Sequence, residues 1–342
     1  MKELLIAIDQ GGSKTDLVIF SIDGKLLLRT NDKFIRLEHI GSFEGKRWYY
    51  IEKLITGALE LLDASVSDIA GIVAALCGAD WQKNYRQMQE ELARRLHIPQ
   101  EIITIVNDCV AALRGGQPIN EMKQNSAVIY AGTMFNCALE SSSGKSYTYG
   151  RMINADDHGA FAIGKQVWNA IIDAYNGFQE PTIMTNILLE KYDADSVQDI
   201  CEKFTSNSLV FQPITFASVL FQAIEREDMV AKIIFSKFAN RWTRYVINGA
   251  HLVGFTAHTV VSLYLAGGVF KNCPQLWLKE IEQCLNQYKY NIDCSLSKLE
   301  PVAGAMLLLL EKLYQRPLCE QMIDNIVQSD LYSTLVIDSD IM

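Results

Sequence analysis

The chain repeats its own opening pattern at a shift of 120 positions. Residues 4–30 contain three apolar runs separated by two glycine turns, which is typical of antiparallel strands joined by tight turns. The pattern returns from residue 127, and four side-chain types coincide in this register: Gly12-Ser13 with Gly132-Thr133, and Gly24-Lys25 with Gly144-Lys145. Such a repeat indicates a duplicated structural unit. It predicts two similar α/β domains that face each other, each with a Gly-hydroxyl turn pointing into the cleft between them.

The length of the chain agrees with two domains, because 342 residues exceed what one compact core usually holds. We expect the first domain to span residues 1–116 and the second to span residues 117–342. Residues 164–250 lack strand alternation and are predicted to be mostly helical, as an insertion in the second domain. Residues 301–314 are predicted to form a late helix that packs back on the first domain.

Composition excludes several classes of protein. Apolar residues make up 49% of the chain and charged residues 21%, so a disordered chain is excluded. The net charge of −9 gives no general attraction for nucleic acid or anionic lipid, and neither is expected as a partner. No apolar run approaches the roughly 20 residues of a membrane span. The eight cysteines include no C-x-x-C pair, which favours reduced core thiols and a cytoplasmic location.

The first turn of the repeat carries groups that suit a phosphate. Glycines let backbone N–H groups approach an anion, and hydroxyl and ammonium side chains add donors: Gly11, Gly12, Ser13, Lys14 and Thr15. Asp9, at the end of the preceding strand, could hold Mg²⁺ directly or through water. The alternative is an ordinary glycine hairpin with a capping aspartate. The pattern is not a Walker phosphate loop, because no G-x-x-x-x-G-K-[ST] segment opens a helix here.

Two later strand ends also carry candidate groups. A predicted strand at 102–106 ends at Asn107-Asp108, where the Asp108 carboxylate could accept the proton of a hydroxyl that attacks phosphorus. The alternative role for Asp108 is to cap the following helix. A predicted strand at 260–266 ends at Gly267-Gly268, which either permits close approach of a flat ligand or serves tight helix–strand packing.

Taken together, the motifs resemble the superfamily of acetate and sugar kinases, heat-shock chaperones and actin. The chain is most similar to the BadF/BadG/BcrA/BcrD ATPase family, whose members include N-acetylglucosamine kinases. The matching segments are I-D-Q-G-G-S-K-T at 8–15, L-C-G-A-D at 76–80, V-N-D-C-V-A-A-L at 106–113, A-G-T-M-F-N-C at 131–137, L-A-G-G-V-F-K-N at 265–272 and P-V-A-G-A at 301–305. The resemblance implies two actin-like (ribonuclease H-like) domains with a nucleotide cleft between them.

The resemblance also implies a role for each candidate residue. Asp9 would order Mg²⁺, and Asp108 would be the catalytic base. ATP would be bound by Gly11, Gly12, Ser13, Lys14 and Thr15, by Gly132 and Thr133, and by Gly267, Gly268 and Lys271. The sugar would be bound by Asn107, Asn136 and Asp156.

The chain departs from the family pattern on the sugar side of the predicted site. The family's G-T-G-S-N reads Gly-Thr-Met134-Phe135-Asn here, which adds two bulky side chains, and Arg151 stands where the family has a tryptophan motif. The family's acceptor-binding asparagine is not evident near residue 36. Arg151 could pair with an acidic substituent of the sugar, such as the lactyl group of a muramic sugar, or internally with Asp156 or Asp157.

Other prominent side chains are expected to be structural. His158 follows two aspartates, and a hydrogen-bonded role at a helix start is favoured over a catalytic one. Four tryptophans in predicted helical runs are expected to pack in the core: Trp81, Trp168, Trp242 and Trp277.

These observations predict an enzyme, an ATP-dependent kinase that phosphorylates a hydroxyl of an amino sugar with the help of Mg²⁺. The expected partners are a small-molecule sugar and a second copy of the chain in a homodimer. One alternative is a redox-activator ATPase, as in some relatives of the family, although the dispersed cysteines offer no convincing cluster-binding set. Another is a nucleotide- or sugar-binding protein without transfer activity.

Overall fold

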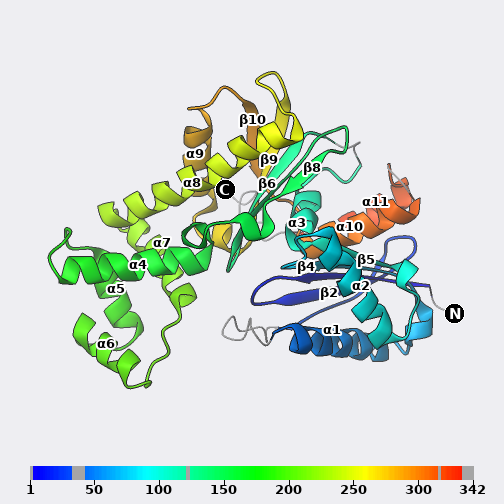
Figure 1. Cartoon of the computed structure of the whole chain (residues 1–342), viewed down its shortest axis with the longest axis horizontal. Coiled ribbons are helices and arrows are strands. Elements are labelled where there is room, and N and C mark those ends of the chain that lie inside the picture. The colour runs from blue at the N-terminus through cyan, green and yellow to red at the C-terminus, as the bar shows by residue number, and fades with distance from the viewer. Residues whose placement is uncertain (1–2, 33–42, 121–123, 315–316, 333–342) are drawn as a thin grey trace.

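Two five-stranded sheets form the framework of the protein (Figure 1). The structure is a computed structural model, and it describes residues 3–32, 43–120, 124–314 and 317–332. The first sheet contains β1 (Leu4–Gln10), β2 (Thr15–Ser21), β3 (Leu26–Asp32), β4 (Ile69–Leu76) and β5 (Ile103–Asn107). The second contains β6 (Ser126–Ala131), β7 (Phe135–Glu140), β8 (Ser146–Thr148), β9 (Val260–Ala266) and β10 (Asn291–Leu296).

The two sheets have the same topology. Their strand orders are β3-β2-β1-β4-β5 and β8-β7-β6-β9-β10, so each strand has a counterpart at the same place in the other sheet. In both sheets the first three strands pair antiparallel, and the last two run parallel to the first. The duplication predicted from the sequence is therefore confirmed. The pattern did not reveal β8 and β10, which are short or largely exposed along one face.

Helices cover both faces of the first sheet. Alternate β1 side chains, Leu4, Ile6 and Ile8, join a core with α1 (Phe43–Glu60) and α2 (Gln82–Leu96). The intervening Leu5 and Ala7 join a second core formed with α10 (Pro301–Tyr314) and α11 (Glu320–Val327). The late helix thus lies on the first sheet, far in sequence from the strands that it covers.

The insertion between β8 and β9 is helical. It comprises α4 (Ala160–Tyr175), α5 (Ile183–Lys191), α6 (Val197–Thr205), α7 (Ala217–Glu225) and α8 (Met229–Val253), and α9 (Pro274–Leu285) follows β9. The mostly helical character predicted for residues 164–250 is confirmed. Figure 1 shows α4 to α7 extending away from the two sheets, while α8 and α9 lie beside the second sheet.

The short helix α3 (Asp108–Gly116) lies between the two halves of the molecule, each of which consists of one sheet and the helices that cover it. Its Ala111 belongs to the core beneath the first sheet, while Cys109, Ala112 and Leu113 pack against strands of the second sheet. Gly304 lets α10 approach α3, because a Cβ at Gly304 would lie 1.9 Å from the backbone oxygen of Ala111. The packing therefore holds the first residue of α3, Asp108, where the two halves meet.

The tryptophans divide into two groups. Trp242 and Trp277 are fully buried in the core of the second half, and Trp168 packs at its edge, as predicted. Trp81 is 54% exposed, so the prediction of a packing role is wrong there. It precedes α2 instead of lying within it. No helix in the described part of the chain combines the length and hydropathy that crossing a bilayer requires.

Candidate active site

A cavity of about 800 Å³ opens between the two halves of the molecule. The β1–β2 turn, the ends of β4 and β5, and the start of α10 line it from one side, and the β6–β7 turn and the end of β9 line it from the other. The structure brings thirteen of the predicted site residues to this cavity: Asp9, Gly11, Gly12, Ser13, Lys14, Asn107, Asp108, Gly132, Thr133, Asn136, Gly267, Gly268 and Lys271. Two others, Thr15 and Asp156, do not line it.

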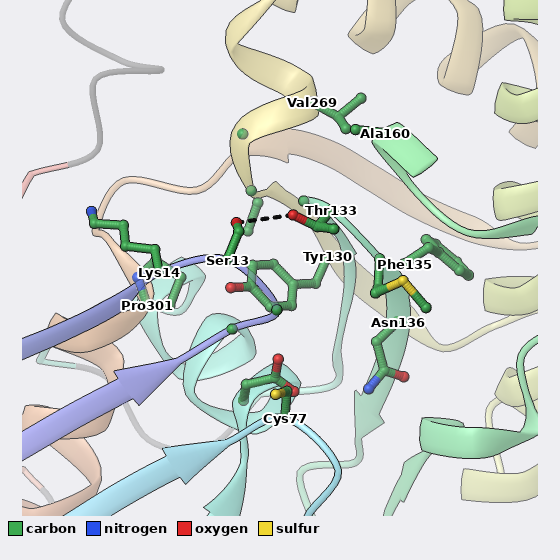
Figure 2. A pocket seen from close by; sticks show the side chains of 18 of the residues that line it. Ser13, Lys14, Cys77, Tyr130, Thr133, Phe135, Asn136, Ala160, Val269 and Pro301 are labelled. Atoms are coloured by element: carbon green, nitrogen blue, oxygen red, sulfur yellow. Dashed lines mark hydrogen bonds between the residues drawn. The ribbon is translucent and has the colours of Figure 1, made fainter. Parts of the chain in front are cut away.

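The two Gly-hydroxyl turns meet at the cavity. The Ser13 and Thr133 hydroxyl oxygens, 120 positions apart in the chain, lie 3.0 Å from each other. The dashed line in Figure 2 marks this contact. Each turn is closed by its own backbone: the Gly11 N–H donates to the Lys14 oxygen, and the Gly132 N–H donates to the Met134 oxygen. An anion bound here would therefore receive donors from both halves at once.

The glycines of the cavity fall into two kinds. A Cβ at Gly132 or Gly268 would meet no atom within 4 Å, so these glycines keep space open that the protein itself does not fill. Gly267 has φ +105°, and a Cβ there would lie 2.4 Å from the Ala131 backbone oxygen. Of the two alternatives for the Gly-Gly pair, strand packing thus explains Gly267, while free space for a ligand fits Gly268.

Asp108 occupies the first position of α3. Its carboxylate accepts a 3.0 Å hydrogen bond from the Cys109 N–H, and the Asn107 side chain accepts from the same N–H at 2.9 Å. Asn107 is the N-cap residue of the helix, so the alternative that Asp108 itself serves as the cap is wrong. The Asp108 carboxylate is left facing the cavity.

Burial sets the acidity of Asp108. It raises the pKa of this carboxyl to about 7, with the Cys109 N–H and Arg47 opposing the rise and the neighbouring Asp80 adding to it. A carboxylate with a pKa near neutrality is half deprotonated at neutral pH and gains driving force for accepting a proton. Asp108 thus has the acidity of a general base.

Asp9 is the second buried carboxylate of the cavity. Burial, followed by the negative charges of Asp108 and Asp16, raises its pKa well above the ordinary value, and Lys14 opposes the rise. Its Oδ1 atom is buried and has no hydrogen-bond partner among the residues that the structure describes. An orphaned carboxylate oxygen beside other carboxylates is a suitable ligand for a divalent cation.

A single carboxylate, that of Asp9, suits Mg²⁺ better than it suits a metal ion whose ligands all come from the protein. In the described ranges no three His, Cys, Asp or Glu side chains gather into a metal-binding group. Mg²⁺ usually takes one or two carboxylates and completes its shell with water and substrate phosphates. Asp9 next to the phosphate turns therefore fits a Mg²⁺ ion that arrives with a nucleotide.

A chain of amides and charges forms the wall opposite the phosphate turns. Asn136 donates to Asn107 at 3.1 Å, and Asn107 donates to Asp80 at 3.0 Å. The Asp80 carboxylate also faces Arg151, 3.5 Å away, and Arg47 donates to the Cys77 backbone oxygen at 2.8 Å. Sequence reasoning gave no role to Arg47, Cys77 or Asp80. The signal for Cys77 and Asp80 was their place in the family-like segment L-C-G-A-D at 76–80, whereas Arg47 comes from α1, where no motif indicated a site residue.

The contacts of Arg151 differ from the predicted internal pairs. Asp156 pairs with Lys165 at 3.1 Å, and Asp157 pairs with Arg241 at 2.7 Å. Arg151 turns the other way, towards Asp80, so the expected pairing with Asp156 or Asp157 is wrong. Since the Asp156 side chain is 63% exposed and outside the cavity wall, the structure does not bring this predicted sugar ligand to the site.

The two bulky residues after Thr133 lie in different surroundings. Phe135 lines the cavity but is buried, and it stacks on Trp242 with ring centroids 5.2 Å apart, so most of its ring lies in the core of the second half. Met134 is 37% exposed at the cavity. His158 accepts a hydrogen bond from the Phe135 N–H, and its burial lowers its pKa, in keeping with the structural role predicted for it.

The remaining predicted ligands have protein partners. Lys14 pairs with Asp16 at 2.6 Å, and Lys271 pairs with Glu300 at 3.3 Å; both lysines are still more than 40% exposed in their side chains. Thr15 is buried and accepts a hydrogen bond from Gln10. The family's asparagine sought near residue 36 falls outside the described residues.

Two known kinases are similar to this chain in sequence. An N-acetylmuramic acid/N-acetylglucosamine kinase of Clostridium acetobutylicum is 26% identical over 89% of this chain and 97% of its own length. An N-acetyl-D-glucosamine kinase of Dictyostelium discoideum is 23% identical over 90% of this chain and 98% of its own.

Solved structures agree on the architecture. A ROK family glucokinase from Streptomyces griseus, in complex with glucose and AMPPNP, has a TM-score of 0.58 at 16% identity over 91% of this chain and 98% of its own. A ROK hexokinase from Thermus thermophilus has a TM-score of 0.53 at 14% identity over 91% and 99%. The predicted fold class of two actin-like α/β halves is thereby confirmed. Residues 6–308 match the family model of the BadF/BadG/BcrA/BcrD ATPases, and the chain belongs to that family.

Proposed function

We propose that the protein is an ATP-dependent kinase that phosphorylates a hydroxyl of N-acetylglucosamine or a related cell-wall amino sugar. The observation that carries the proposal is the geometry of the cavity. Two phosphate-type turns, one from each half, meet at Ser13 and Thr133, and Asp108, with a pKa of about 7, lines the same cavity. Kinase names among the relatives that match nearly the whole chain support the same activity.

In this mechanism the two halves hold the two substrates. The donors of the Gly-hydroxyl turns bind the ATP phosphates, and the open space at Gly268 accommodates the adenosine. Mg²⁺ held at Asp9 would supply positive charge to the phosphates. Closure of the cavity around both substrates would exclude the water that hydrolyses ATP.

Asp108 takes part in the transfer itself. The acceptor hydroxyl oxygen forms a bond to the γ-phosphorus, and its proton passes to the Asp108 carboxylate. The bond from the γ-phosphorus to the β,γ-bridging oxygen breaks, and its electron pair stays on ADP. Asn107 and Asn136, which adjoin Asp108, would orient the acceptor.

The position of Arg151 favours a sugar acceptor that carries a carboxylate. Its side chain pairs with Asp80 at 3.5 Å but remains 63% exposed, so part of the guanidinium is accessible from the cavity. A guanidinium in this position can form a bidentate pair with an acidic substituent of the sugar. The relative named for N-acetylmuramic acid makes the lactyl ether of that sugar a natural candidate.

A panel of sugars tests the proposal. Purified protein would be given ATP, Mg²⁺ and one sugar at a time, including N-acetylglucosamine, N-acetylmuramic acid and glucose, and ADP release and the phosphorylated product would be measured. We expect sugar-dependent ADP release with an amino sugar. ATP binding without turnover on any sugar would contradict it and favour a binding protein.

The redox-activator alternative has a separate test. All eight cysteines are free and dispersed, and burial raises the pKa of several of them, Cys77 to about 12. An iron-containing preparation would favour this alternative, and a colourless, iron-free one would oppose it. A cytoplasmic location and a homodimer remain predictions, which fractionation and sedimentation would check.

A further inference from the structure

Tyr130 reaches the cavity without an assigned role. It lies in β6, two residues before Gly132, and faces Asn136 and Ala266 on the neighbouring strands. Figure 2 shows its ring between the phosphate turns, represented by Ser13 and Thr133, and Cys77. The Tyr130 side chain therefore lies in the cavity between the phosphate turns and Cys77.

The surroundings keep the Tyr130 hydroxyl a donor. Its ring packs against the cluster that contains Cys109 and Ala112 of α3, the helix that begins at Asp108. Burial, followed by the negative charges of Asp9 and Asp108, raises the pKa of Tyr130 well above its ordinary value. The phenol thus stays protonated at any pH at which the enzyme would be assayed.

The Tyr130 hydroxyl is free to donate a hydrogen bond to a ligand. Among the described residues the Tyr130 hydroxyl makes no hydrogen bond, although the ring itself is well packed. In the part of the chain that the structure describes, this hydroxyl is not one of the fully buried polar atoms that lack a partner; it opens on the cavity, where a ligand can accept from it. Since Tyr130 lines the same cavity as the two Gly-hydroxyl turns, a phosphoryl oxygen bound at those turns could accept its hydrogen bond.

We propose that the Tyr130 hydroxyl donates a hydrogen bond to a non-bridging oxygen of the phosphoryl group as that group passes from ATP to the sugar. The inference rests on the proposed kinase function and adds a catalytic residue to it. During transfer the negative charge spreads over the three non-bridging oxygens, and a fixed donor in the cavity that the turns and Asp108 share would stabilise it there. The Tyr130 proton stays on the phenol, since the acceptor's proton goes to Asp108.

Tyr130→Phe separates this role from packing, because phenylalanine keeps the ring and removes only the hydroxyl. We expect kcat to fall about 100-fold, the usual effect of losing one such donor, while the KM values for ATP and sugar change less than about threefold. Tyr147→Phe is the matched control: this β8 tyrosine does not line the cavity, and its variant should keep wild-type kcat. A kcat of Tyr130→Phe within twofold of wild type would overturn the inference.

A binding measurement keeps the inference separate from the proposed function. Calorimetry would compare ADP alone with ADP plus aluminium fluoride, a mimic of the transferring phosphoryl group, both with Mg²⁺. We expect Tyr130→Phe to bind ADP like the wild type but to lose most of the gain from aluminium fluoride. An equal gain in both proteins would overturn the inference. A wild type that phosphorylates no sugar would contradict the kinase function, while this comparison would still decide the role of Tyr130.

Discussion

The role of a base that we propose for Asp108 depends on its burial at the start of α3, which raises its pKa to about 7. Asp108→Asn is expected to lower kcat by about 10²–10⁴-fold, the usual contribution of a positioned base, and to leave ATP affinity largely intact. Isothermal titration with ATP and steady-state rates on the identified sugar would measure both. Unchanged turnover would remove Asp108 from the mechanism.

The same residue predicts the pH dependence of the reaction. Because the base must be deprotonated and the pKa of Asp108 is about 7, the wild-type rate should fall roughly tenfold per pH unit below neutrality and level off above it. The residual rate of Asp108→Asn should not show this acidic limb. A wild-type profile that stays flat from pH 5.5 to 8 would contradict the assignment.

Arg151 predicts selectivity among acceptors. Arg151→Ala should lower kcat/KM for N-acetylmuramic acid by about tenfold, since an exposed charge-assisted hydrogen bond is lost, and should hardly affect N-acetylglucosamine. Arg94→Ala on the exposed face of α2 removes the same charge far from the cavity and serves as the control. Equal losses on both sugars, or no loss on either, would reject recognition by Arg151.

At the scale of elements, two neighbouring glycines at the end of β9 have different roles: Gly267 packs against the backbone, and Gly268 faces open space. Gly268→Val adds a side chain in open space, so we expect a folded protein that no longer binds ATP. Gly267→Val places its Cβ against the Ala131 backbone oxygen at a positive φ, so we expect a loss of stability by several kcal/mol. Thermal unfolding and nucleotide titration of both variants check the pair. Tight ATP binding by a folded Gly268→Val protein would place the adenosine elsewhere.

The helices that follow each sheet explain why the cavity lies between the halves. α3 follows the last strand of the first sheet and packs on the second, whereas α10 follows the last strand of the second sheet and packs on the first. The close approach of these helices at Gly304 and Ala111 joins the halves beneath the cavity.

For the whole molecule, the buried Asp108 carboxylate lowers the free energy of unfolding when it is charged. Its folded pKa of about 7 exceeds the ordinary value of 3.8, so the folded state binds more protons than the unfolded state between these values. The free energy of unfolding contributed by this group therefore falls as the pH rises through that window, and the contribution is lost above pH 7. The full effect is at most about 4 kcal/mol.

Asp108→Asn tests this cost because asparagine stays neutral. The variant should unfold at a higher temperature than the wild type at pH 8, and the difference should be smaller at pH 5, where the wild-type carboxyl is protonated in the folded state. Calorimetry at both pH values measures it. A difference that does not depend on pH would contradict the buried charge as its cause.

The sequence by itself determined the duplicated α/β framework, apart from β8 and β10, and indicated most residues of the proposed phosphate site. Apolar runs and glycine turns are local patterns, so the duplication, the Gly-hydroxyl turns and the strand-end position of Asp108 could all be found without a structure. The register of the repeat even pairs Ser13 with Thr133, which meet across the cavity.

Only the tertiary structure decided which side chains complete the site. Asp80, Arg47 and Tyr130 come from three separate elements, and no local pattern indicates that their side chains converge. Arg151 contacts Asp80, 71 positions earlier, instead of the aspartates that follow it closely in the chain. Periodicity specifies which face of an element is buried, but the partner of a polar side chain depends on how distant elements pack, and that packing is a property of the whole fold.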